Sequence, residues 1–385
     1  MGRKESESGE GLPGTNLIGY VRYEMGIGES CRMAARALER AGVPFGVYPF
    51  SGGCTSRSED SSLEAFYVSE PEYAINLVHV NADQMPVAYG ELGPSWFEGR
   101  YTIGYWHWEL PEFPDEFAEG FRYVDEVWVP SAFVARGVAA KSPVPVVRIP
   151  HGVEVRVPPG MSRRTFGLPE RRFLFLMMYD TFSYSSRKNP ASVIEAYRRA
   201  ALQFGLPADL VVKMNNPQPE EIAAIRRATE DLPGVHLIDR TLGRLETNAL
   251  LACADCLVSL HRAEGFGLPI AEAMELGKPV IATAWSGNED FMSPGNSGAV
   301  RYRLQPLGRD FGPYRSEQVW AEPDVEHAAF LMRKVVYDEE WRARISAEGR
   351  LTIRTTFSPA ASGLAMARRL AQIAGERDAR RPGMR

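Results

Sequence analysis

The feature that most constrains the fold is an alternation that runs along the whole chain. Short apolar runs rich in β-branched residues alternate with segments whose apolar residues recur at helical spacing. This pattern is typical of α/β proteins, in which helices connect the strands of a parallel sheet. In the first half we expect strands at Asn16–Val21, Val43–Pro49, Ala74–Val80, Tyr101–Tyr105, Glu126–Val129 and Val144–Ile149, and helices at Ser30–Ala41, Glu112–Tyr123 and Ser131–Ala140.

A stretch that begins at Pro150 interrupts the alternation. The segment PHGVEVRVPPGMSRRTFGLPE is rich in Pro, Gly and Arg, which is typical of a connection between domains. A second series follows, in which we expect strands at Phe173–Met178, Leu210–Met214, Val235–Ile238, Cys256–Leu260, Val280–Thr283 and Ala299–Tyr302. The expected helices are Pro190–Phe204, Pro219–Glu230, Arg244–Cys253 and Pro269–Leu276, with three more after Val325, the last at Pro359–Ala374.

The chain length also favours two domains. At 385 residues it exceeds the roughly 250–300 residues at which a single core stops growing. We therefore predict an α/β protein with two doubly wound, Rossmann-like domains facing each other across a cleft, where the carboxyl ends of parallel strands bind ligands. The expected parts are a disordered leader (1–15), a first domain (16–152), a second domain (153–357), a C-terminal helix crossing back to the first domain (358–375) and a flexible tail (376–385).

The composition excludes several classes of protein. Hydrophobic residues make up 44% and charged residues 24% of the chain, as in ordinary globular proteins, and the net charge is −5 without a long basic run. A nucleic-acid partner is therefore not expected. No stretch approaches the roughly 18 consecutive apolar residues of a transmembrane helix, and the leader MGRKESESGEGLPG has no apolar core for a signal peptide. We expect a cytoplasmic protein.

The cysteines do not indicate a metal site or a disulfide framework. Cys31, Cys54, Cys253 and Cys256 are few for a chain of this size. Cys253 and Cys256 form a C-x-x-C, but they lie where a helix is expected to run into a buried strand, and a zinc site needs a second ligand pair nearby. We interpret them as small buried residues.

The most informative segment is LHRAEGFGLPIAEAMELGKPVIAT, from Leu260 to Thr283. Glu264 follows a predicted strand, and Gly265 and Gly267 let the backbone approach a ligand closely. Pro269 suits the first position of a helix and Gly277 its end. Glu272 therefore faces the same region eight residues after Glu264. Carboxylates accept charge-assisted hydrogen bonds from hydroxyl-rich ligands, and the helix N-terminus favours an anion such as a diphosphate.

This segment resembles the signature of the retaining glycosyltransferases of family four, which have the two-domain GT-B fold. The likeness lies in EGFGLPIAE and continues through AEAMELGKPVIATAWSGNEDF, and it covers nearly the whole chain. It implies that Glu264 contacts the hydroxyls of the donor sugar and that Glu272 holds the nucleotide ribose. The turn between them, Gly265, Phe266, Gly267 and Leu268, would lie beside the donor. The alternative is that the two glutamates are an ordinary solvated residue and a helix-start residue.

Cations are expected at the same sheet edge. In SYSSRKNPASVIEAYRRA, Asn189 is a natural N-cap and Pro190 a natural first helical residue, so Arg187 and Lys188 lie at a helix N-terminus. Lys213, in LVVKMNN, ends the next strand. Cations there would stabilise a diphosphate leaving group. The resemblance supports Lys188 and Lys213, but relatives often have Gly-Arg where this chain has Tyr179-Asp180. Arg187 would then supply the missing guanidinium; the alternative is a set of solvated cations.

Other candidates come mainly from the first half. Gly26 and Gly28 in EMGIGES begin a G-x-G after the first strand, but Cys31 breaks the dinucleotide fingerprint, so they indicate either the cleft wall or an ordinary turn. The aromatic segment GYWHWEL places Trp106, His107, Trp108 and Glu109 after a strand, where aromatic faces suit sugar rings or apolar acceptor tails; the alternative is surface packing. Weaker candidates are Asn81, Asp83, the interdomain turn His151–Gly152 and the loop Ser286, Gly287 and Asn288. His261 would either contact the donor or have a structural role.

The resemblance implies a retaining, metal-independent hexosyltransferase. It would move a sugar from a nucleoside diphosphate sugar, its co-substrate, to a hydroxyl of a glycan, lipid-linked or small-molecule acceptor, with no further cofactor. The segments LHRAEGFGL and SGNEDFM are similar to segments of bacterial polysaccharide mannosyltransferases, and this similarity suggests GDP-mannose as the donor. No two aspartates are separated by one residue, so the Asp-x-Asp metal motif is not found. A nucleotide-sugar epimerase and a catalytically silent binding module stay open as alternatives, as does peripheral contact with the inner face of a membrane.

Overall fold

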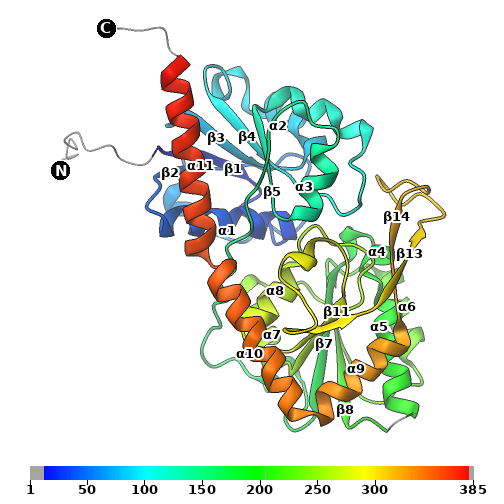
Figure 1. Ribbon diagram of the computed structural model, residues 1–385. Coiled ribbons are helices and arrows are strands. Elements are labelled where there is room, and N and C mark those ends of the chain that lie inside the picture. Colours follow the sequence, from blue (N-terminus) through cyan, green and yellow to red (C-terminus); the bar gives the residue numbers. More distant parts are fainter. Residues whose placement is uncertain (1–12, 204, 381–385) are drawn as a thin grey trace.

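The computed structural model describes residues 13–203 and 205–380 and consists of two α/β domains stacked one on the other (Figure 1). The first domain contains a parallel sheet in the order β2-β1-β3-β4-β5-β6. Its strands are β1 (Thr15–Gly19), β2 (Phe45–Pro49), β3 (Ile75–His79), β4 (Tyr101–Tyr105), β5 (Glu126–Val129) and β6 (Val146–Arg148), and its helices are α1 (Gly26–Arg40), α2 (Met85–Leu92) and α3 (Ala132–Ala139).

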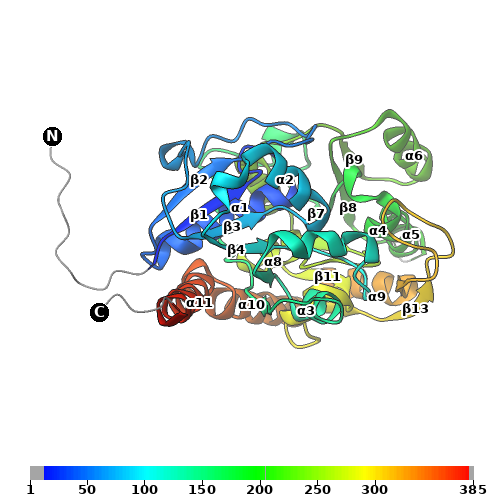
Figure 2. The ribbon, with the colours of Figure 1, turned by 90° about the horizontal axis from the view of Figure 1, so that it is seen from above.

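The second domain contains another parallel sheet, in the order β12-β11-β10-β7-β8-β9. Its strands are β7 (Phe173–Asp180), β8 (Ala208–Asn215), β9 (Val235–Ile238), β10 (Cys256–Ser259), β11 (Val280–Thr283) and β12 (Gly298–Val300). Its helices are α4 (Ser185–Lys188), α5 (Pro190–Arg198), α6 (Pro219–Thr229), α7 (Arg244–Cys253), α8 (Leu268–Glu275), α9 (Val325–Tyr337) and α10 (Glu339–Thr356). Seen from above, this domain extends beyond the first on the side of α6, opposite α11 (Pro359–Arg380) (Figure 2).

The strand order explains why ligands would gather at one place in each sheet. In the second sheet the chain passes from β7 through β8 to β9 and then returns to the other side of β7 with β10. The switch point lies between β7 and β10, and the crevice beyond the carboxyl ends of such a strand pair is where open α/β sheets bind ligands. The corresponding switch in the first sheet lies between β1 and β3.

The strands are apolar because helices cover both faces of each sheet. All residues of β1, β3, β5 and β11 are buried. In the first domain one cluster includes Leu17, Leu77 and Trp128. In the second, the two faces are packed by clusters around Phe175 and Leu176. Since neither face meets water, continuous apolar runs rather than alternating ones mark these strands in the sequence.

The last helix, α11, returns to the first domain and packs against α1 (Figure 1). The contact is close: a Cβ on Gly363 would lie 2.1 Å from the carbonyl oxygen of Ala37. At the domain junction the two chain crossings run side by side, because Val153 N–H donates to the carbonyl of Phe357 at 2.7 Å and Ser362 Oγ donates to that of Pro150 at 2.6 Å. α11 continues to Arg380, so residues 376–380, expected in a flexible tail, are helical.

Several expectations from the sequence differ from the structure. Asp115–Tyr123 is a 3₁₀ segment rather than the α-helix expected over Glu112–Tyr123, and it begins directly after Pro114, which cannot donate a backbone hydrogen bond. The helix expected to reach residue 204 ends as α5 at Arg198 and continues as one π turn. The strand expected over Ala299–Tyr302 is divided between β12 and the next strand. Helix α2 was not expected, and residues 1–12 of the predicted leader and 381–385 of the predicted tail lie outside the described residues.

An antiparallel hairpin was also not expected from the sequence. β13 (Tyr302–Pro306) pairs with β14 (Val319–Pro323), and the loop between them reaches the first domain. Leu307, Tyr314 and Trp320 join the apolar cluster of the first domain around Trp106 and Trp108. The hairpin is therefore part of the second domain in sequence but part of the first-domain core in packing.

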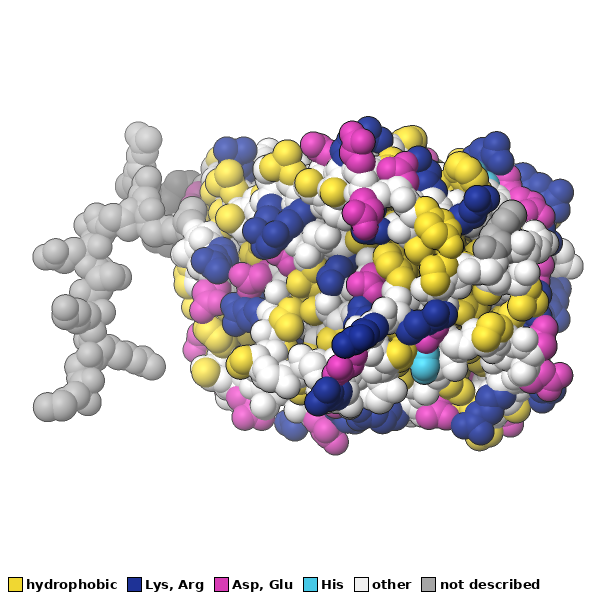
Figure 3. Space-filling model, turned by 90° about the horizontal axis from the view of Figure 1, so that it is seen from below, with side chains coloured by type: hydrophobic (Ala, Val, Ile, Leu, Met, Phe, Trp, Pro, Cys, Tyr) yellow, Lys and Arg dark blue, Asp and Glu magenta, His cyan; other side chains and the backbone are white. Residues whose placement is uncertain are grey.

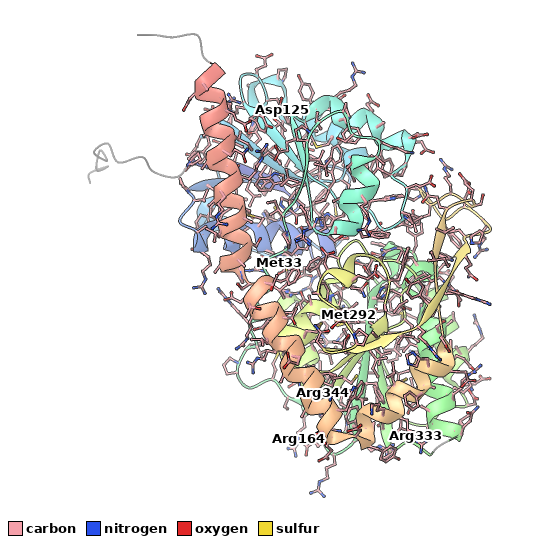
Figure 4. All side chains as sticks on the ribbon, viewed as in Figure 1. Met33, Asp125, Arg164, Met292, Arg333 and Arg344 are labelled. Carbon is pink, nitrogen blue, oxygen red and sulfur yellow. The ribbon has the colours of Figure 1, made fainter. Side chains whose placement is uncertain are left out.

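Side chains from both domains occupy the space between them, with Met33 of α1 on one side of the boundary and Met292 on the other (Figure 4). On the underside of the second domain, basic and acidic side chains are interspersed (Figure 3). Among the described residues, no helix is both long and apolar enough to span a bilayer.

Candidate active site

A small pocket lies at the switch point of the second sheet. Its wall is formed by the ends of β7 and β10 and by the start of α8, and it is lined by Met177, Met178, Tyr179, Lys188, Leu257, Val258, Ser259, Glu264, Gly267, Pro269 and Ile270. The pocket thus combines the carboxyl edge of two parallel strands with a helix N-terminus, and it holds one lysine and one glutamate that the sequence singled out.

Glu264 is buried between two cations. Lys188 Nζ lies 2.5 Å from Glu264 Oε1, and Arg187 Nη1 lies 3.5 Å from Glu264 Oε2. Burial raises the pKa of Glu264, but Lys188 and Arg187 outweigh it and hold the pKa at about 2. Glu264 is therefore an anion at neutral pH. Its contacts with Lys188 and Arg187 bring together residues that were predicted from two separate sequence motifs.

Arg187 also reaches the first domain. It is buried, donates from Nη1 to the carbonyl of Ala263 at 2.9 Å, and lies 3.6 Å from Glu109 Oε1 of the first domain. Tyr314 from the hairpin loop donates to Glu109 Oε2 at 2.8 Å and presents its ring to the guanidinium. The Arg187 guanidinium thus lies between two carboxylates, one from each domain, and is not a solvated cation.

Glu272 is arranged in the same way around a different arginine. Its Oε1 accepts from Arg244 Nη2 at 2.5 Å, and Arg244 Nε lies 3.5 Å from Glu29 Oε1 on α1 of the first domain. Burial raises the pKa of Glu272 in spite of Arg244. Glu29, which also pairs with Arg32 and Arg36, has its pKa lowered because these three arginines outweigh its burial.

Lys213 lies at the end of β8, apart from Glu264. It is buried, and its Nζ donates to Asn215 Oδ1 at 3.2 Å. Within residues 13–203 and 205–380, no carboxylate lies within 4.0 Å of this ammonium group in the way that Glu264 meets Lys188. Burial lowers the pKa of Lys213 to about 8, with Asp180 and Glu24 opposing that shift.

The glycine-rich turn is shaped by packing as well as by access for a ligand. Gly267 has φ +92°, which favours glycine, and it lies at the N-cap of α8. Gly265 faces the first domain, since a Cβ there would lie 3.1 Å from the carbonyl oxygen of Trp108, and its own carbonyl accepts from Ser131 Oγ at 2.6 Å. The expectation that both glycines admit a ligand therefore needs correction for Gly265, whose close approach is to the other domain.

The loop after β11 supports the backbone of Glu264. Glu264 N–H donates to Ser286 Oγ at 2.8 Å, and Gly287 N–H donates to the carbonyl of Glu264 at 2.8 Å. A Cβ on Gly287 would lie 2.1 Å from the carbonyl oxygen of Gly265. Asn288 accepts at 3.0 Å from Nε2 of the buried His261, whose Nδ1 lies 3.0 Å from Ser259 Oγ, so both ring nitrogens of His261 have partners within the second domain.

Two further predictions differ from the structure. Trp106 and Trp108 are buried among Phe113 and Phe121, so they offer no face to a sugar or an acceptor. Asn189 lies at the N-cap of α5 but does not cap it, because its side chain donates to the carbonyl of Leu260 at 3.0 Å. Arg187 and Lys188 end the short helix α4 and directly precede the N-terminus of α5, as expected.

His107 is half-buried and contacts the buried His151 at the domain boundary. Its Nε2 lies 3.2 Å from His151 Nε2, and His151 Nδ1 lies 3.2 Å from Tyr105 Oη. The backbone N–H of His107 donates to Asn81 at 2.9 Å, whereas Asp83 bonds Gln84 at the surface. Burial lowers the pKa of His107 to about 4, so the ring is neutral at pH 7. His151 contacts Phe266 edge-on at 4.8 Å and so joins the interdomain turn to the glycine-rich turn.

The two glycines of the first domain have different surroundings. A Cβ on Gly28 would lie 2.3 Å from the carbonyl oxygen of Tyr23, so this glycine is required for packing of the turn. Around Gly26 no heavy atom of the described residues lies within 4 Å of a Cβ position, so a ligand could approach there. The sequence did not single out Arg244, Glu29 or Tyr314; their importance depends on contacts between segments far apart in the chain.

No group of three or more His, Cys, Asp or Glu side chains is arranged to hold a metal ion within the described ranges. The four cysteines are free; Cys256 is buried in β10 and Cys253 is half-buried at the end of α7.

Comparison with known proteins identifies the fold. Residues 177–305 match the family described as glycosyl transferases group 1, and this segment contains Arg187, Lys188, Lys213, Glu264 and Glu272. Sucrose-phosphate synthase from Thermosynechococcus elongatus has a similar structure, with a TM-score of 0.68 at 16% identity over 94% of this chain and 100% of that chain. The chain has the GT-B fold.

Two further GT-B structures support this assignment. A glycosyltransferase from Rickettsia africae has a TM-score of 0.67 at 14% identity and covers 94% of this chain and 97% of its own. HepE from Anabaena, in complex with UDP and glucose, has a TM-score of 0.64 at 14% identity and covers 94% of this chain and 100% of its own. No curated protein sequence matches the chain. At these identities the likeness concerns the GT-B fold alone.

Proposed function

We propose that this GT-B protein is a retaining glycosyltransferase that moves a sugar from a nucleoside diphosphate sugar to a hydroxyl of a glycan, lipid-linked or small-molecule acceptor. The observation that carries the proposal is the contact of Glu264 with Lys188 and Arg187 at the switch point of the second sheet. All three residues lie in the segment that matches the glycosyl transferases group 1 family.

Each element of the cluster suits one part of such a donor. The N-terminus of α8 and the ammonium group of Lys188 attract the diphosphate. The carboxylate of Glu264, anionic with a pKa of about 2, accepts hydrogen bonds from sugar hydroxyls beside the pocket. Glu272 has one oxygen on Arg244, and its other oxygen suits a ribose hydroxyl. The acceptor would approach from the first domain, past Glu109 and His107.

In the proposed reaction the bond between the sugar carbon and the diphosphate oxygen breaks, and a bond forms from that carbon to the acceptor oxygen. Both events occur on the same face of the sugar, which retains its configuration, and the acceptor proton passes to the departing diphosphate. Lys188, Lys213 and Arg187 would stabilise the charge that develops on the diphosphate. We propose on this basis that no divalent metal is required.

The donor is proposed to be GDP-mannose, on the strength of the similarity of the LHRAEGFGL and SGNEDFM segments to polysaccharide mannosyltransferases. The complex of HepE with UDP and glucose makes UDP-sugars the necessary comparison.

The test is a donor-consumption assay with GDP-mannose, UDP-glucose and UDP-N-acetylglucosamine, with and without a mixture of glycan and lipid-linked acceptors. Transfer with retained anomeric configuration, unaffected by EDTA, supports the proposal. Conversion of the donor to an epimer without acceptor indicates the epimerase instead. Nucleotide binding without turnover indicates a silent binding module. Activity that EDTA abolishes and Mn²⁺ restores would overturn the metal-independent account.

A further inference from the structure

The two motif glutamates share an unexpected arrangement. Each lies on one side of an arginine whose other side meets a glutamate of the first domain. Glu264, Arg187 and Glu109 form one such bridge, with separations of 3.5 and 3.6 Å. Glu272, Arg244 and Glu29 form the other, with separations of 2.5 and 3.5 Å. The two arginines come from different helices, α4 and α7.

Four of the six side chains in these bridges are well shielded from water, whereas Glu109 and Arg244 are 23% and 22% exposed. The Arg187 and Glu264 side chains are 4% and 12% exposed, and the Glu29 and Glu272 side chains are 5% and 2% exposed. Charges in such surroundings interact more strongly than on the surface, and a buried charge is costly unless it is paired. Without Arg244, Glu29 and Glu272 would face each other across the domain boundary as like charges, and the proximity of Glu29 already contributes to the raised pKa of Glu272.

The charges of the first bridge and its lysine are already balanced. Arg187 and Lys188 carry two positive charges, and Glu264 and Glu109 carry two negative charges. A diphosphate at the pocket is a further anion. At the guanidinium of Arg187 it would compete with the two carboxylates that already lie beside this cation. Because Glu264 is also held by Lys188, the carboxylate that can release Arg187 at least cost is that of Glu109, whose side chain is 23% exposed.

We propose that Glu109 competes with the diphosphate of the donor for Arg187. The first domain would thus supply a carboxylate that takes the place of a phosphate oxygen at a cation of the second domain. Donor entry then exchanges an interdomain contact for a contact with the ligand. This inference rests on the proposed function, since it assumes a nucleoside diphosphate as ligand. It predicts that the Glu109 carboxylate weakens donor binding, whereas a side chain at this place would otherwise be taken to strengthen it.

The test compares Glu109→Gln with Glu116→Gln by calorimetric titration of the full chain with GDP and UDP, and with guanosine and uridine. Glu116 is a suitable control because it too pairs across the domain boundary, with Arg315, but at the surface and away from the motif glutamates. We expect Glu109→Gln to bind the diphosphates more tightly, on the order of tenfold, because one anion beside Arg187 is lost. Binding of the two nucleosides, and all binding by Glu116→Gln, should match the wild type.

If the wild type binds GDP or UDP and Glu109→Gln binds them with the same or a lower affinity, the competition is overturned while the proposed function stays intact. A wild-type chain that binds none of the nucleotides overturns the proposed function itself.

Discussion

At the scale of single residues, Glu264 has the most contacts that bear on chemistry. We expect Glu264→Gln to lower transferase turnover by about one to two orders of magnitude, because a hydrogen bond to a charged group contributes about 1.5–3 kcal/mol. Glu275→Gln is the matched control: this residue lies at the end of α8, outside the pocket, and like Glu264 it pairs with an arginine, Arg354 at 3.1 Å. Steady-state rates of the two folded variants make the comparison, and wild-type turnover in Glu264→Gln would remove this carboxylate from the donor site.

Lys213 gives a prediction for pH. Its pKa is lowered to about 8 by burial, so the ammonium group loses its proton as the pH rises through that value. If its charge helps to hold the diphosphate, the affinity for GDP should fall between about pH 7 and 9, by up to tenfold per pH unit above the pKa. Lys213→Arg, whose guanidinium stays charged, should show no such fall. The measurement is the dissociation constant at several pH values; a wild-type affinity that is constant up to pH 9 would contradict the role of Lys213.

At the scale of elements, α11 packs on the first domain and also makes a buried ion pair with it. Arg369 Nε lies 2.9 Å from Glu126 Oε1 on β5, and Glu126 is completely buried. Arg369→Ala would leave that carboxylate buried without its cation, which typically costs about 3–5 kcal/mol. Arg368→Ala, one residue earlier and exposed, should change the free energy of unfolding by less than about 0.5 kcal/mol. Urea unfolding of both variants tests this, and equal stabilities would mean that the pair does not hold α11.

The elements also explain which parts of the fold the sequence could reveal. β4, β5, β9, β11 and α7 have the bounds expected from the sequence, because each is a short periodic or apolar run between turn residues. Helix α2 was not predicted from the sequence because Pro86 and Gly90 interrupt its helical spacing of apolar residues. β13 carries Arg303 and Gln305 and is largely exposed, so no buried face marks it in the sequence.

The residues of the candidate site also differ in whether the sequence alone could identify them. Glu264, Glu272 and Lys188 lie in local motifs, and the sequence reveals them. The partners Glu29 and Arg244 act through contacts between distant segments, which a linear pattern does not encode, whereas Glu109 was predicted as a cleft residue but not as the partner of Arg187. Trp106 and Trp108 illustrate the converse error, since a local pattern of aromatic residues cannot distinguish a binding face from a packed one.

At the scale of the whole molecule, the hairpin loop couples the two domains. Tyr314 and Trp320 belong to the second domain in sequence but pack in the first-domain core. We expect the chain to unfold in a single calorimetric transition. Tyr314→Ala should broaden or split that transition, because it removes the contacts to Trp108 and Glu109. Leu304→Ala, on the exposed face of β13, is the control and should leave one transition. Two transitions in the wild type would show that the hairpin does not couple the domains.

The return of α11 to the first domain has a consequence for how such proteins can be recombined. The first domain is built from two separate pieces of chain, residues 13–150 and the helix Pro359–Arg380, whereas the second is one continuous insert between them. A gene fusion with a single junction near residue 152 would therefore join a first domain to a foreign final helix, which must fit a surface where Gly363 touches Ala37. An exchange with two junctions, one at each of the hydrogen-bonded crossings, transfers the second domain as a complete unit and leaves α11 on its own partner.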